Sequence, residues 1–70
     1  MGFATTVKAG RRKLNMTQKE FAELLDVPVP TLQGWEKTDG KDPNQATQNY
    51  IKVAVAHPDI VRQVLRSSRG

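Results

Sequence analysis

The segment from Thr17 to Lys37, TQKEFAELLDVPVPTLQGWEK, constrains the fold of this chain more than any other stretch. Its apolar residues recur at helical spacing on both sides of a short interruption that contains two prolines. This spacing predicts two short helices that cross at a tight turn and bury a shared face. The apolar residues that would form this face are Phe21, Ala22, Leu25, Val27, Leu32 and Trp35. The outer face of the second helix is left exposed, as in the helix pairs that small basic domains place in the major groove of DNA.

The first helix of the pair has a well-marked beginning. Thr17 can act as its N-cap, and Glu20, three residues later, can reach back to the Thr17 amide. Met16 and Phe21 can pack against each other across this start as a hydrophobic staple. We therefore predict a helix over about residues 18–25.

One acid and two prolines define the turn that follows. Asp26 is predicted to end the helix in a left-handed backbone conformation, which aspartate tolerates better than most residues. Pro28 and Pro30 cannot lie inside a helix, but they suit a turn and a first helical turn, where amides lack internal partners. The next helix is therefore expected to run from Val29 or Pro30 to Glu36.

A further helix is predicted before this pair, over about residues 4–14. Asn15 is suited to end it in the left-handed region. Its apolar stripe has the spacing of a buried helix face and consists of Phe3, Val7, Gly10 and Leu14.

Two more helices are predicted after the pair. Asp42 or Asn44 can cap a helix over about residues 44–56, and a last helix is expected over about residues 58–66. The face predicted to be apolar on the first of these consists of Ala46, Tyr50, Val53 and Ala54. The sequence thus predicts an all-α, compact five-helix fold in a single domain of residues 1–66, with residues 67–70 frayed.

Composition excludes several classes of site and function. With no cysteine and one histidine among 70 residues, disulfides, thiolate zinc sites and most histidine metal sites are excluded. His57 has no serine, cysteine or acid at nucleophile–base spacing, so we expect no enzyme, no metal and no cofactor. No apolar run approaches the roughly 20 residues that span a bilayer. These features predict a cytoplasmic protein.

The net charge of +4 is unevenly distributed along the chain. Residues 1–19 carry five cations and no acid, the last eleven residues carry three arginines and no acid, and the acids gather in the middle. Basic ends of this kind favour a polyanionic partner, although they also suit a solvated surface.

The residues of the central segment resemble those of a known family. The matching positions are Gln18, Ala22, Asp26–Val27, Leu32 and Trp35–Glu36, and the segment resembles the helix-turn-helix of the Xre family, of the Cro and lambda-repressor type. The resemblance covers about residues 8–43. It implies a lambda-repressor-like domain that binds double-stranded DNA, most simply an autoregulatory repressor that binds an inverted repeat as a homodimer.

Four positions depart from the family pattern. Asp26 stands where the turn commonly has glycine. Val29 and Pro30 stand where early residues of the second helix usually read bases, and Gly34 stands where many relatives have a polar residue. Few polar side chains are therefore left to read bases.

The resemblance assigns the DNA contacts to particular residues. Gln33, Thr31 and Lys37 would supply polar groups to bases, and Val29 would contact thymine methyl groups. Gln18 would bind a phosphate together with the free amides of its helix. The complete set of expected base contacts is Val29, Pro30, Thr31, Gln33, Gly34 and Lys37, and the expected phosphate contacts are Arg11, Arg12, Gln18 and Lys19. Solvent exposure is the competing explanation for Gln33, and plain surface charge for Arg11 and Arg12.

The last two predicted helices would supply the surface for dimerisation, and some of their apolar residues must instead close the monomer core. The candidate interface consists of Tyr50, Ile51, Val55, Ile60, Val61, Val64 and Leu65. Three other functions stay open, one of which is nonspecific binding of nucleic acid, since few polar side chains are left to read bases. The segment VPVPTLQGWE with a helix beginning HPDIV also resembles HigA-like antitoxins, whose partner is a toxin protein, and small phage anti-CRISPR-associated repressors share this size.

Overall fold

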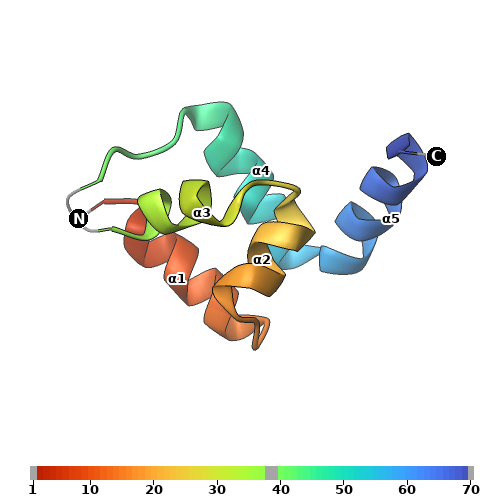
Figure 1. Cartoon of the computed structure of the whole chain (residues 1–70), viewed down its shortest axis with the longest axis horizontal. Helices are drawn as coiled ribbons and strands as arrows, with labels where there is room; N and C mark the ends of the chain where they lie inside the picture. The colour runs from red at the N-terminus through yellow and green to blue at the C-terminus, as the bar shows by residue number, and fades with distance from the viewer. Residues whose placement is uncertain (1, 38–39, 70) are drawn as a thin grey trace.

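The computed structural model describes residues 2–37 and 40–69, and over these residues it contains helices and no strand. The helices are α1 (Ala4–Lys13), α2 (Gln18–Leu25), α3 (Val29–Glu36), α4 (Gln45–Ala56) and α5 (Pro58–Arg69). The predicted all-α fold is confirmed. In Figure 1, α1 and α3 lie toward one end of the molecule, and α5 extends to the other end of its long axis. Helix α5 also continues to Arg69, beyond the expected end at Arg66.

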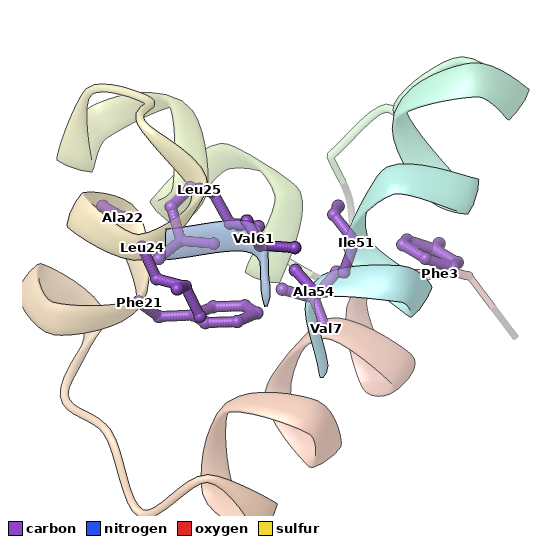
Figure 2. Packing of buried hydrophobic residues seen from close by; sticks show 10 residues of the cluster. Phe3, Val7, Phe21, Ala22, Leu24, Leu25, Ile51, Ala54 and Val61 are labelled. Carbon is purple, nitrogen blue, oxygen red and sulfur yellow. The ribbon is translucent and has the colours of Figure 1, made fainter. Parts of the chain in front are cut away.

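The core lies where the helices α1 to α5 converge, and Figure 2 shows its side chains pointing toward one another. Phe21, Leu32 and Ile51 are its largest fully buried side chains. The whole cluster consists of Phe3, Val7, Phe21, Ala22, Leu24, Leu25, Leu32, Ile51, Ala54 and Val61.

Helix α1 packs closely against α4 because residue 10 is glycine. A Cβ atom added at Gly10 would lie 2.6 Å from Cγ2 of Val55. The predicted stripe of α1 faces inward, since Phe3, Val7 and Gly10 are buried and Leu14 is half-buried. Beyond α1, Asn15 has a φ of 57°, which confirms the left-handed conformation expected there.

The capping box predicted at the start of α2 is present. Thr17 Oγ1 accepts a hydrogen bond from the Glu20 amide at 3.1 Å, and Glu20 Oε1 accepts one from the Thr17 amide at 2.9 Å. The bond from the Thr17 backbone amide, followed by that from the Thr17 side chain, lowers the pKa of Glu20 below its usual 4.5. At the other end of α2, Asp26 has φ 61° and ψ 45°, the predicted left-handed conformation.

The two candidate caps of α4 have different roles. Asn44 is the N-cap, and its Oδ1 accepts a hydrogen bond from the Thr47 amide at 2.8 Å. Asp42 instead accepts a hydrogen bond from the Phe3 amide at 3.0 Å and so joins the start of the chain to the loop before α4.

Several residues of α4 and α5 face differently from the prediction. Ile51 is only 1% exposed and Val61 only 6% exposed, so both belong to the monomer core and cannot form a dimer surface. The side of α4 that packs inward carries Ile51 and Ala54. Val53, expected on the apolar face, is instead 53% exposed, and Ala46 is also exposed.

Three other candidate interface residues are half-buried within the monomer. The hydroxyl group of Tyr50 donates a hydrogen bond to the Leu25 carbonyl at 2.9 Å, which joins α4 to the end of α2, and burial raises the pKa of Tyr50. Val55 packs on Gly10, and Leu65 packs against the core. Of the seven candidates, Ile60 and Val64 are the ones left largely exposed, at 51% and 55%.

Candidate nucleic-acid interface

Helix α3 separates a buried side from an exposed side, as predicted. Leu32 is fully buried, and Trp35 is half-buried against the core. The predicted base contacts fall into two groups on the rest of the helix. Those that are exposed are Pro30, Thr31, Gln33 and Lys37, and those that are half-buried are Val29 and Gly34. Because Val29 packs against the core, only part of its side chain is free to meet a thymine methyl group.

The start of α3 offers few backbone donors. Pro28 is its N-cap with φ −62° and ψ 145°, and no side chain caps the helix. Pro30, in the first turn, has no amide hydrogen to donate. The first free amides of α2, at Gln18 and Lys19, are therefore the better place for a phosphate.

Two glycines near the end of α3 differ in what surrounds them. A Cβ atom added at Gly34 would meet nothing within 4 Å, so the fold itself does not require glycine there. A Cβ atom added at Gly40 would lie 2.5 Å from the Gly34 carbonyl oxygen. Gly40 is thus needed for the chain to pass close to α3, whereas Gly34 leaves open space on the outer side of the helix.

The structure gives Arg11 a different role from the expected phosphate contact. Its Nε donates to Glu36 Oε2 at 2.9 Å, its Nη2 to Glu36 Oε1 at 3.1 Å, and its Nη1 to the Met16 carbonyl at 3.2 Å. The side chain is 18% exposed and that of Glu36 is 3% exposed. All three nitrogens of the guanidinium group are engaged inside the protein, so Arg11 joins α1 to α3.

Arg12 and Lys19 keep the exposure that a phosphate contact requires. Arg12 lies in the last turn of α1, where a cation also interacts favourably with the helix dipole. Lys19 lies in the first turn of α2. Both side chains remain candidate phosphate contacts.

Gln18 is held in place by two other side chains. Its Nε2 donates to Glu36 Oε1 at 3.1 Å, and its Oε1 accepts from Gln33 Nε2 at 3.4 Å. The start of α2 and the exposed face of α3 are therefore connected by hydrogen-bonded amides. The predicted phosphate contact and the predicted base contact lie side by side.

Glu36 is the residue of this site whose role the sequence reasoning did not identify. It is 4% exposed, the buried charged residue in the described part of the chain. A signal for it was present, because Glu36 follows Leu32 by four positions and so lies on the same side of α3. A buried acid requires a cationic partner, and Arg11 on α1 supplies it.

The described ranges, 2–37 and 40–69, hold no group of three or more histidine, cysteine or acidic residues arranged to bind a metal ion. They also contain no helix with the length and apolar character needed to cross a membrane.

Comparison with known proteins agrees with this geometry. A family model described as Helix-turn-helix matches residues 7–47, which is more than half of the chain and covers most of α1, all of α2 and α3, and the start of α4. No curated protein and no solved structure matches the chain significantly. The matched residues include the capped helix α2, the left-handed turn at Asp26 and the exposed helix α3. The chain therefore belongs to the Xre, or lambda-repressor-like, helix-turn-helix family of DNA-binding regulators.

Proposed function

We propose that this protein is a sequence-specific transcriptional regulator, an autoregulatory repressor that binds an inverted repeat as a homodimer. The observation that carries the proposal is the outer face of α3. Its exposed residue Gln33 is hydrogen-bonded to Gln18 at the start of α2, so a base contact and a phosphate contact lie side by side. Such an arrangement lets phosphate contacts fix the position of the helix while its side chains read bases.

The base contacts in this proposal come from a small set of residues. Gln33, Thr31 and Lys37 provide polar groups, while Pro30 and the exposed part of Val29 provide apolar contact. The open space outside Gly34 lets the helix approach the groove closely. Arg12, Lys19 and Gln18 contact phosphates. Arg11 is withdrawn from that group because its guanidinium is bound to Glu36.

The dimer in this proposal forms through the exposed apolar residues of α4 and α5. Val53, Ile60 and Val64 are each more than half exposed, and α5 lies away from α3 along the molecule (Figure 1). A second copy that covered these residues would leave α3 free. Each α3 would then enter one half-site, with half-sites roughly 34 Å apart on one face of the DNA.

Selection of binding sites from random DNA, followed by footprinting on the DNA upstream of the protein's own gene, tests this function. We expect a selected inverted repeat, and protection of the same repeat upstream of the gene. Transcription from that DNA should fall when the protein is added; a rise would identify an activator. Equal affinity for all sequences would contradict sequence-specific regulation.

Sedimentation over a range of concentrations tests the dimer. Val64→Asp places a charge on the proposed interface and should leave a monomer, whereas Gln63→Asp, an exposed change one position earlier and so on another side of the same helix, serves as the control. A wild-type chain that stays monomeric at high micromolar concentration and on its operator would contradict the dimer. The protein so described needs no cofactor and no catalytic group, and its place of action is the DNA of the cytoplasm.

A further inference from the structure

A continuous row of hydrogen bonds runs from the buried ion pair to the exposed face of α3. Glu36 accepts from Arg11 and from Nε2 of Gln18, and Gln18 in turn accepts from Nε2 of Gln33. The first members are buried, since Glu36 is 4% exposed, and the last member is at the surface. A buried carboxylate is thereby connected to the side chain proposed to read a base.

The chemistry of Glu36 determines the direction of every bond in this row. A carboxylate paired with a guanidinium group can only accept hydrogen bonds. Gln18 must therefore turn its Nε2 toward Glu36, which leaves its Oε1 toward Gln33. Gln33 must then offer its own Nε2 to Gln18. The groups of Gln33 that remain for a ligand are its Oε1 and the second hydrogen of Nε2.

This orientation of the Gln33 amide has a consequence for base recognition. One acceptor beside one donor is the combination with which glutamine binds N6 and N7 of adenine in the major groove. If Gln18 and Gln33 were both reversed, Oε1 of Gln33 would accept from Nε2 of Gln18, and the exposed NH₂ group of Gln33 would offer donors only. Donors alone fit O6 and N7 of guanine.

We propose that Glu36 is a positioning residue for DNA recognition. Acting through Gln18, it holds the amide of Gln33 in the orientation that favours adenine over guanine at one base pair of each half-site. This inference rests on the proposed function, because it requires Gln33 to contact a base. Exclusion of water by bound DNA would strengthen the exposed bond between Gln33 and Gln18.

The test measures a ratio of dissociation constants at one base pair. The base pair contacted by Gln33 is identified with the Gln33→Ala variant: it is the base pair of the selected operator whose substitution lowers the affinity of the wild-type protein but not that of the variant. At that base pair A·T is replaced by G·C, and the Kd of the two DNAs is compared. For the wild-type protein we expect adenine to be preferred by about 5- to 150-fold, the range of a good bidentate contact.

Two variants break the row at different places. In Glu36→Gln, the amide cannot accept from Arg11 with both of its terminal atoms and still orient Gln18. In Gln18→Met, the link to Gln33 is lost while the Arg11–Glu36 pair stays. Each should reduce the preference for adenine to about 3-fold or less, because the Gln33 amide can then turn to present either pattern. If Glu36→Gln fails to fold, as circular dichroism would reveal, Gln18→Met decides the question.

Gln45→Met is the matched control. It also removes an amide–amide hydrogen bond, that from Gln45 Nε2 to Asn49 Oδ1 at 2.9 Å, but at the start of α4 and outside the row. The adenine preference should be unchanged in this variant. If Gln18→Met lowers the affinity for both DNAs equally and leaves the ratio of their dissociation constants unchanged, it has removed a phosphate contact only, and this result counts against the inference.

A second measurement follows the row in the absence of DNA. The side-chain NH₂ resonances of Gln33 in the free protein should shift in Gln18→Met and in Glu36→Gln, and stay in place in Gln45→Met. The inference is overturned if these resonances do not respond, or if specific binding persists with the adenine preference intact in both variants. If the wild-type protein has no sequence preference at all, the proposed function fails and this role with it. The Gln33 resonances then still report whether the row of bonds exists.

Discussion

Two regions of the molecule differ in the contacts that stabilise them. One is formed by α1, α2 and α3 and is called here the polar side; the other is formed by α4 and α5 and is called the apolar side. The first has the capping box of α2, the Arg11–Glu36 pair and the hydrogen bonds of Gln18. The second has single side-chain hydrogen bonds, such as the Asn44 cap of α4 and the bond from Tyr50 to Leu25, and leaves Val53, Ile60 and Val64 exposed. Directional bonds fix the positions of the side chains proposed to contact DNA, whereas an exposed apolar surface is suited to association, which tolerates less exact placement.

Removing the ion pair should have the largest effect on the first side. Arg11→Ala leaves the carboxylate of Glu36 buried without a cation, which costs about 3–5 kcal/mol of stability. Because small domains have a low free energy of unfolding, we expect most molecules of this variant to be unfolded at 37 °C. Urea denaturation followed by circular dichroism measures the change.

Arg12→Ala is the matched control for Arg11→Ala. It removes the neighbouring arginine, which is exposed and makes no contact with Glu36, and its effect on stability should be within about 0.5 kcal/mol. Its effect on DNA binding should be larger: the affinity for every DNA sequence should fall, and the affinity should depend less on salt concentration. Equal stability of the two variants would mean that the pair contributes little.

The polar side is also the part that the sequence predicts best. Thr17, Glu20 and Asp26 act through neighbours within four residues, so the capping box and the left-handed turn follow from local sequence. The role of Arg11 could not be derived in the same way, because its partner Glu36 is 25 positions away. Charge alone does not distinguish an arginine that binds phosphate from one that binds a buried acid.

The second largest effect is expected where the two sides meet. Gly10→Ala places a methyl group 2.6 Å from Cγ2 of Val55, and such overpacking costs about 1–3 kcal/mol. Better helix propensity returns about 1 kcal/mol of this. We expect thermal unfolding to show a net loss of stability. The loss caused by Gly10→Ala should be smaller in a Val55→Ala background than in the wild-type protein.

Gly34→Ala adds a methyl group at the other helical glycine and should raise the stability instead of lowering it. Nothing lies within 4 Å of the added methyl group, so only the propensity gain of about 1 kcal/mol should be seen. If the open space serves close approach to DNA, affinity should fall although the protein is more stable. A loss of stability at both glycines would show that crowding by Val55 is not the cause at Gly10.

The apolar side shows where sequence patterns are insufficient. Residues 51, 53, 54 and 55 of α4 are all apolar, so the spacing fits more than one buried face. Only the packing of α1 and α2 against α4 decides that Ile51 faces inward and Val53 outward. The boundaries of α4 could be predicted within a residue, because Asn44 and Pro58 mark the chain locally, whereas its buried face could not.

A smaller effect should separate two isoleucines of the apolar side. Ile51→Val removes one methyl group from the core and should cost about 0.5–1.5 kcal/mol. Ile60→Val makes the same change at a residue that is 51% exposed, and should alter the stability of the monomer by less than about 0.5 kcal/mol. Urea denaturation of the dilute monomer compares them, and equal losses would contradict the assignment of Ile51 to the core and Ile60 to the surface.

The smallest effect concerns the charge in the capping box and its dependence on pH. Because the folded state lowers the pKa of Glu20 below 4.5, the ionised form stabilises the fold above that pH, and this contribution is lost as the pH falls through the lower, folded-state value. Glu20→Gln keeps an acceptor for the Thr17 amide but removes the charge. The variant should therefore be less stable than the wild type at neutral pH, and the difference should shrink as the pH falls below 4.5. Glu23→Gln removes an exposed acid of α2 outside the capping box, so subtracting its effect isolates the contribution of the box. A difference that stays constant from pH 7 to pH 3 would show that the hydrogen bonds of Thr17 do not depend on the charge of Glu20, and that α2 is held by neutral polar contacts alone.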